Sequence, residues 1–197
     1  MNKTTERGGA RLRSAGFLGA VPFGREPTGP KLVSLVLPLH NEEGNIPELY
    51  RRITAVMAPT NYLLEMIFVD DGSKDGSAAA VAKLAAIDSR VKYVGLSRNF
   101  GHQYALTAGL DLASGDAVIC MDSDLQHPPK YIKDLLKKWE QGYDVVNTER
   151  IDGRNIPFFK SVTSRFFYFL INLISDVNIL KGGADFRLLD EKVVDVI

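Results

Sequence analysis

The chain has 197 residues, of which 45% are hydrophobic and 24% are charged, which is typical of one globular domain with a sizeable core. Lysine plus arginine equals aspartate plus glutamate at 24 each, so the formal net charge is zero and no basic surplus is present to bind nucleic acid in bulk. The single cysteine, Cys120, excludes an intrachain disulfide and a cysteine-based zinc site, and its apolar surroundings in the sequence predict a buried thiol.

Residues 1–30 differ in composition from the rest of the chain. They are rich in glycine, arginine, threonine and proline, and their apolar runs are shorter than the roughly 7–15 residues of a signal-peptide core. We therefore expect a disordered leader, for which a targeting or partner-binding role remains an alternative, followed by one domain over residues 31–197.

From residue 32 onward, apolar β-rich runs alternate with helix-like stretches. Asn41 is a candidate helix cap, and Pro129 stands where a helix tolerates proline. The predicted elements are, in chain order, strand 32–37, helix 42–57, strand 63–69, helix 76–87, strand 91–96, helix 103–113, strand 117–121, helix 129–139 and strand 143–147. Continuously apolar strands indicate burial on both faces, so the pattern predicts an α/β fold with a Rossmann-like, mostly parallel sheet flanked by helices.

Beyond residue 148 the alternation stops. Several basic residues precede a strongly apolar, aromatic segment at 158–175, whose uninterrupted apolar core is about half the ~20 residues that a spanning helix needs. Two interpretations remain open from the residues alone: a buried helix, or an amphipathic helix at a membrane interface with basic flanks.

Polar loops follow the first four predicted strands. In doubly wound sheets ligands bind at the carboxyl ends of the strands, where these loops meet. Three of the four carry acidic residues; the loops are 38–43, 70–77, 97–102 and 122–129. This distribution predicts a ligand site at one edge of the sheet.

Asp122, Asp124 and Gln126 alternate directly after the fourth predicted strand. Two carboxylates separated by one residue can reach one cation, and hard oxygen ligands suit Mg²⁺ or Mn²⁺. The sequence therefore predicts a divalent-metal site here. The alternative is that Asp124 is a turn residue in a loop that binds no metal.

The run Asp70-Asp71-Gly72-Ser73 follows the second predicted strand. Capping and a tight turn need only one of the two acids, so the second is available to accept a hydrogen bond from a base or a ribose hydroxyl. The sequence contains neither a phosphate-binding loop of the Gly-x-x-x-x-Gly-Lys type nor Gly-x-Gly-x-x-Gly after a strand. The phosphates of a nucleotide ligand would have to be neutralised by metal and arginine.

Four runs of the sequence carry a resemblance to a known family: VSLVLPLHNEEGNIPELYRRI, IFVDDGSKDGS, GLSRNFGHQYALTAGLDLASGDAVICMDSDLQHPP and GADFRLLDEKVVD. They lie within residues 31–197 and resemble the family 2 glycosyltransferases, which have the GT-A fold. More closely, they resemble the polyprenyl-phosphate glycosyltransferases, a group that includes bactoprenol glucosyltransferases and dolichol-phosphate mannosyltransferases. The FGHQ and DSDLQHPP runs favour the bactoprenol branch.

This resemblance implies inverting transfer of a hexose from a nucleotide sugar, of the UDP-glucose or GDP-mannose type, to a polyprenyl phosphate. It implies a need for Mg²⁺ or Mn²⁺, contact with the membrane surface at its cytoplasmic face and a role in cell-wall or lipopolysaccharide biogenesis, and it leaves room for a homo-oligomer. Close relatives continue into two C-terminal membrane helices, which we expect this chain to lack. Two alternatives remain: a glycosyltransferase that acts on a glycan acceptor, and an inactive nucleotide-sugar-binding domain.

The resemblance also implies roles for individual residues. Asp124 and Asp185 are the expected catalytic residues, and Asp122, Asp124 and Gln126 the expected metal ligands. The expected donor-binding residues are Pro38, His40, Glu42, Asp71, Asp122, Ser123 and Arg150. His40 departs from the family pattern, in which a tyrosine is common at this position.

Arg154 and Arg165 are the residues expected to contact the acceptor phosphate. They lie in sequence beside the apolar segment, so that charge for a head group adjoins apolar surface for a lipid tail. A phosphate monoester is already mostly dianionic at neutral pH, because its second pKa is about 6, and so it does not need the strong base that a hydroxyl nucleophile requires. The sequence thus favours a lipid phosphate over a sugar hydroxyl as the acceptor.

Overall fold

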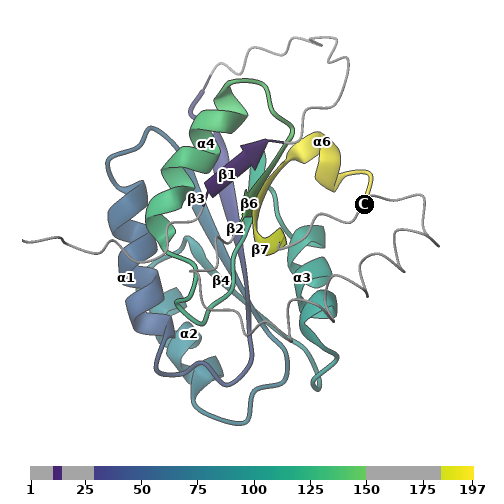
Figure 1. Cartoon of the computed structure of the whole chain (residues 1–197). Coiled ribbons are helices and arrows are strands. Elements are labelled where there is room, and N and C mark those ends of the chain that lie inside the picture. Colours follow the sequence, from purple (N-terminus) through teal and green to yellow (C-terminus); the bar gives the residue numbers. More distant parts are fainter. Residues whose placement is uncertain (1–10, 15–28, 150–182) are drawn as a thin grey trace, which may run out of the picture.

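The computed structural model describes residues 11–14, 29–149 and 183–197, and within them seven strands form a single sheet with the order β1-β6-β7-β5-β2-β3-β4 (Figure 1). The strands are β1 (Arg11–Ser14), β2 (Leu32–Leu39), β3 (Leu63–Asp70), β4 (Val91–Gly95), β5 (Ala117–Cys120), β6 (Val145–Glu149) and β7 (Gly183–Asp190). The helices are α1 (Ile46–Met57), α2 (Ser77–Ile87), α3 (His102–Asp111), α4 (Ile132–Glu140) and α6 (Glu191–Val194), with a 3₁₀ turn, η1 (Pro129–Tyr131), before α4.

The sheet has a parallel half and a mixed half. Strands β4, β3, β2 and β5 are mutually parallel, while β7 is antiparallel to both of its neighbours, β5 and β6. Strand β6 therefore runs in the same direction as β5, and five of the seven described strands share one direction. The predicted α/β architecture with a mostly parallel, helix-flanked sheet is confirmed.

Helices cover both faces of the sheet. Helices α1, α2 and α4 lie over one face, and α3 and α6 over the other (Figure 1). The alternation of side chains along a strand explains this division. In β2, Leu35 and Leu37 belong to the core cluster that contains Leu49 of α1, whereas Val36 packs on the opposite face with Leu106 of α3.

The structure differs from the sequence predictions at the start of the first helix. Helix α1 begins at Ile46, not at residue 42, because the carbonyl of Glu42 accepts the N–H groups of Asn45 and Ile46 in a turn. Asn41 is not the helix cap. It has a φ of 58°, and its side-chain oxygen accepts the backbone N–H of Lys74 at 2.8 Å.

Two strands were not expected from the sequence. Strand β1 lies within the segment predicted to be a disordered leader and pairs with β6, and β7 contains the GADFRLLD run. Cys120 is buried, as predicted. The predicted amphipathic helix at 158–175 lies outside the described residues. Among the helices that the structure does describe, none is long and apolar enough to cross a membrane.

Glu65 is a buried hydrogen-bonding hub that ties the parallel half of the sheet to the connection between α3 and β5. Its carboxylate accepts the hydroxyl of Ser34 on β2 at 2.6 Å and the hydroxyl of Ser114 at 3.0 Å, and it forms an ion pair with Lys92 on β4. Burial raises the pKa of Glu65, but the hydrogen bonds from Lys92, Ser34 and Ser114 outweigh that effect and hold the pKa below its ordinary value of 4.5.

We expect Glu65→Gln to lower the free energy of unfolding by about 1–2 kcal/mol at neutral pH, because the amide loses charge-assisted hydrogen bonds in a buried position. A carboxylate whose pKa is lowered by folding stabilises the folded protein fully at pH values above the unfolded-state pKa. This stabilisation is lost as the pH falls through the folded-state pKa. Wild-type stability should therefore decline below pH 4.5, where Glu65→Gln should decline less. Urea denaturation followed by circular dichroism measures both effects.

Glu48→Gln, in an exposed ion-pair cluster on α1, is the control and should change stability less. Equal stability of Glu65→Gln and wild type at neutral pH would contradict the prediction.

Candidate active site

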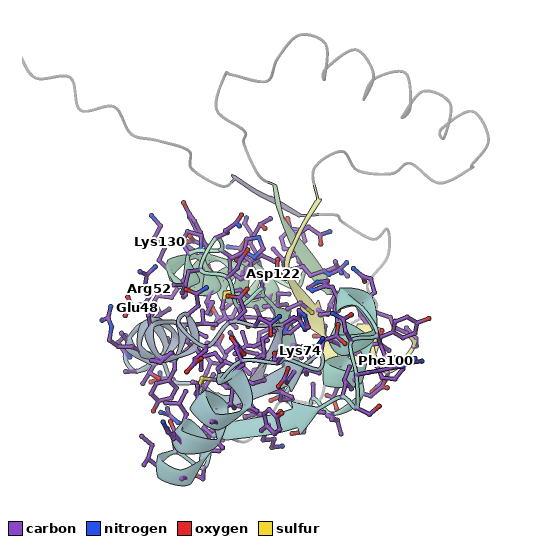
Figure 2. All side chains as sticks on the ribbon, turned by 90° about the horizontal axis from the view of Figure 1, so that it is seen from below. Glu48, Arg52, Lys74, Phe100, Asp122 and Lys130 are labelled. Carbon is purple, nitrogen blue, oxygen red and sulfur yellow. The ribbon has the colours of Figure 1, made fainter. Side chains whose placement is uncertain are left out.

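A cavity of about 390 Å³ lies at the carboxyl edge of β2, β3 and β5, where the polar loops converge. Figure 2 shows Asp122 between Phe100, on one side of the view, and Glu48, Arg52 and Lys130 on the other. The residues that line the cavity are Pro38, Leu39, His40, Glu42, Asp71, Asn99, Gly101, His102, Ala105, Asp122, Ser123 and Asp124. The structure thus brings together seven of the predicted site residues from three separate loops.

The paired acids at the end of β3, Asp70 and Asp71, both make structural hydrogen bonds. Asp70 accepts the backbone N–H of Ser73 at 2.8 Å and the hydroxyl of Tyr93 at 3.0 Å. Asp71, which is buried, accepts the backbone N–H of Phe100 at 2.7 Å with one oxygen and that of Gly101 at 2.9 Å with the other. Asp71 therefore holds the loop between β4 and α3 against the cavity, in addition to lining it. Its predicted contact with the donor base or ribose stays a prediction.

His40 is held by two neighbours at the rim of the cavity. Its Nδ1 donates to the carbonyl oxygen of Asp71 at 2.8 Å, and the amide nitrogen of Asn99 lies 3.3 Å from its Nε2. Together these contacts favour the orientation in which Nδ1 faces the carbonyl oxygen of Asp71 and Nε2 faces Asn99. Asn99 was not singled out from the sequence, although the SRNFGHQ run contains it.

The loop after β5 presents two carboxylates to the cavity. Asp124 Oδ1 accepts the backbone N–H of Gln126 at 2.9 Å, and Leu125 between them has a φ of 63°, so the loop turns tightly there. The hydroxyl of Ser123 is buried without a hydrogen-bond partner among the described residues. Gln126 is exposed and does not line the cavity.

This arrangement fits a hard divalent cation whose coordination is completed by a bound ligand. Mg²⁺ commonly binds through one or two protein carboxylates together with substrate phosphates and water, and Asp122 and Asp124 supply that number. No group of three His, Cys, Asp or Glu side chains in the described part of the chain forms a self-sufficient metal cage. The geometry suits an ion that arrives with a phosphate-bearing molecule better than a permanently bound structural metal.

Two histidines flank Asp122, and sequence reasoning assigned no role to either. His102 Nε2, at the start of α3, lies 3.5 Å from Asp122 Oδ1, and His127 Nδ1 lies 3.6 Å from Oδ2. The ring of His127 stacks on Phe186 of β7, with ring centroids 5.6 Å apart and an interplanar angle of 23°. Both histidines lie within motifs of the sequence, FGHQ and LQHPP, and these motifs are the sequence feature that could have indicated a role for them.

Strand β7 brings Asp185 to the same edge of the sheet. In its antiparallel pairing with β5, Arg187 is opposite Cys120. Asp185 precedes Arg187 by two residues in β7. The predicted phosphate-contacting residues Arg150, Arg154 and Arg165 lie outside the described residues.

The sequence matches the family described as Glycosyl transferase family 2 over residues 34–197. The chain belongs to glycosyl transferase family 2. Among the family members similar to it, the uncharacterized glycosyltransferase YkcC of Bacillus subtilis (strain 168) is 45% identical over 162 residues, which are 82% of this chain and 50% of YkcC. The bactoprenol glucosyl transferase of Shigella phage SfV is 42% identical over 165 residues, or 84% of this chain and 54% of that protein. The resemblance found in the sequence is confirmed, and the chain spans about half the length of the curated relatives it matches.

Solved structures of other glycosyltransferases confirm the fold. Mannosyl-3-phosphoglycerate synthase from Rubrobacter xylanophilus is similar with a TM-score of 0.61 and 20% identity, over 83% of this chain and 54% of that one. Glucosyl-3-phosphoglycerate synthase from Mycobacterium tuberculosis has a TM-score of 0.54 and 22% identity, over 83% and 58%. At these sequence identities, the similarity establishes that this chain and the two synthases share a fold.

Proposed function

We propose that this family 2 chain transfers a hexose from a nucleotide sugar, of the UDP-glucose or GDP-mannose type, to a polyprenyl phosphate with inversion at the anomeric carbon. The observation that carries the proposal is the convergence of Asp122 and Asp124 with His40, Glu42 and Asp71 in one cavity at the carboxyl edge of the sheet. The cavity volume of about 390 Å³ is within the ordinary range of small-molecule sites.

The donor's diphosphate is proposed to lie at Asp122 and Asp124, together with a divalent cation. A bound Mg²⁺ or Mn²⁺ would supply Lewis-acid stabilisation of the negative charge on the nucleotide diphosphate leaving group. In support, a structure of glucosyl-3-phosphoglycerate synthase from Mycobacterium tuberculosis contains Mn²⁺, UDP and glucosyl-3-phosphoglycerate. Gln126 and Arg150 remain proposed contacts of the same metal and diphosphate.

The nucleoside is proposed to occupy the other end of the cavity. Pro38, His40 and Glu42 line the cavity and are the proposed nucleoside contacts, and Asp71 holds the backbone of Phe100 and Gly101 in place. His40 lines the cavity with its ring oriented through Nδ1, so this side chain is placed beside the proposed base or ribose, and a hydrogen bond to its Nε2 would replace the approach of Asn99.

The acceptor is proposed to be a lipid-linked phosphate, in which an oxygen attacks the anomeric carbon while the bond to the diphosphate breaks on the opposite side. An already ionised phosphate needs no strong general base, so Asp185 is assigned to orienting the reactants. Several relatives at 41–42% identity are named bactoprenol glucosyl transferases, which supports this acceptor class. Arg154 and Arg165 are the proposed phosphate contacts, and the cytoplasmic face of the membrane is the proposed location.

Calorimetry tests the donor half of the proposal. We expect one of the two donor types, offered as UDP-glucose and GDP-mannose with Mn²⁺, to bind the 197-residue chain, and binding to be lost in EDTA. ADP-glucose serves as a control for the base. Binding that is equal with and without EDTA would remove the metal from the proposal.

A transfer assay with labelled donor tests the acceptor half. Undecaprenyl phosphate in detergent and free oligosaccharides are offered in parallel, and we expect product on the lipid phosphate only. Product on the oligosaccharide alone would favour a glycan acceptor, and donor binding without any transfer would favour an inactive nucleotide-sugar-binding domain.

A further inference from the structure

We propose that His127 is a positioning residue: it orients the carboxylate of Asp122 so that this side chain presents one oxygen to the metal-bound diphosphate. The inference rests on the proposed function, because it assigns His127 to the support of a donor-site ligand. It concerns a residue that does not line the cavity and that lies behind Asp122.

The imidazole of His127 is fixed by the residues around it. Only 12% of its side chain is exposed, and its ring stacks on Phe186, which is fully buried in β7. Pro128 and Pro129 follow it directly, and their fixed φ angles restrict the backbone of the loop. Because ring and backbone are both restrained, the direction in which Nδ1 points is set by the fold.

Nδ1 of His127 points at the metal-site carboxylate. It is buried, it has no hydrogen-bond partner among the residues that the structure describes, and the Oδ2 atom of Asp122 lies 3.6 Å away. A movement of a few tenths of an ångström would bring these atoms to hydrogen-bonding distance. A donating N–H on this atom would leave the opposite oxygen, Oδ1, turned toward His102 and the cavity.

The second histidine has a different place. His102 is 39% exposed and lines the cavity, so it is accessible to the donor itself. His127 is enclosed and can act only through Asp122. Partners that orient metal-binding carboxylates and imidazoles typically contribute about 10–100-fold to metal affinity. If His127 served only to pack against Phe186, its substitution would lower the stability of the fold without selectively lowering the affinity for Mn²⁺.

The experiment measures Mn²⁺ affinity in the presence of UDP from the electron paramagnetic resonance signal of free Mn²⁺. His127→Phe keeps an aromatic ring against Phe186 and removes the N–H, and we expect it to weaken Mn²⁺ binding by about 10–100-fold. His127→Asn, whose amide nitrogen replaces Nδ1, should recover part of that loss. Tyr50→Phe, which removes a hydrogen bond to Asp88 on the α1 side, is the matched control and should leave Mn²⁺ affinity unchanged.

The outcomes separate the inference from the proposed function. Absence of Mn²⁺ binding in the wild-type chain would overturn the metal site and the role of His127 with it. Normal wild-type binding with an unchanged affinity in a folded His127→Phe variant would overturn the positioning role alone. A measurement on the wild type does not depend on the folding of any variant: ¹⁵N spectra of the imidazole should show His127 protonated on Nδ1, and a tautomer protonated only on Nε2 would overturn the proposal.

Discussion

Asp122→Asn is expected to reduce the Mn²⁺-dependent affinity for the nucleotide-sugar donor by at least about 100-fold, because the loss of a direct ligand should exceed the roughly 10–100-fold effect of an outer partner. The substitution preserves the volume of the side chain and removes the charge that a divalent cation requires. Asp122 is also the side chain that His102 and His127 both approach, so the substitution removes the charge that these two histidines face.

Asp124→Asn is the companion variant and separates binding from local structure. Its Oδ1 atom accepts the backbone N–H of Gln126, and an asparagine oxygen can accept the same bond. We therefore expect an intact loop with a similar loss of donor affinity. Isothermal titration calorimetry with donor and Mn²⁺ makes the measurement, and Asp134→Asn, an exposed acid on α4, is the control.

Chelation of the metal shows whether Asp122 and Asp124 act on the donor through a bound cation. EDTA should lower wild-type donor affinity to the level of the variants and should change the variants little. Donor affinity that is the same in wild type, Asp122→Asn and Asp124→Asn would show that neither carboxylate takes part in binding.

Gly72→Ala is expected to lower the free energy of unfolding by about 3 kcal/mol and to weaken donor binding. Gly72 has a φ of 66°, a conformation that costs a residue with a Cβ about 1–2 kcal/mol. A Cβ at this position would also lie 2.5 Å from the carbonyl carbon of Arg98 and 2.6 Å from the nitrogen of Asn99. These are backbone atoms of the loop that Asp71 holds, so they cannot give way without displacing part of the cavity wall.

Two other glycines divide this effect into its parts. Gly142 has a φ of 90° with nothing within 4 Å of an added Cβ, so Gly142→Ala should show the cost of conformation alone. Gly44 has neither a positive φ nor a close neighbour, and Gly44→Ala should be within about 0.5 kcal/mol of wild type. Chemical denaturation of the three variants gives the comparison. If Gly72→Ala costs no more than Gly142→Ala, the loop at residues 98–101 is not held tightly against Gly72.

Local patterns in the sequence predicted most of the parallel half of the fold correctly. The apolar runs that became β2, β3 and β5 are buried as expected, because burial on both faces of a sheet requires continuously apolar strands. Strand β4 pairs with β3 at one end of the described sheet and is largely exposed, so the expected burial on both faces is wrong for it. Strand β7 was missed. Its GADFRLLD run has polar interruptions, and its strand conformation depends on pairing with β5 and β6, which are distant in the sequence.

The same division holds within the candidate site. The sequence by itself determined which loops carry carboxylates and that these loops meet, since the ends of parallel strands share one edge of a sheet. Only the tertiary structure decided that Asp71 accepts the amides of Phe100 and Gly101, and that His102 and His127 reach Asp122 from different elements. The physical reason is that periodicity reports which side of an element is buried, whereas a hydrogen bond between residues some thirty positions apart depends on how loops pack in three dimensions. Seven of the residues that line the cavity were therefore predictable from the chain, whereas Asn99, His102 and the approach of His127 to Asp122 were not.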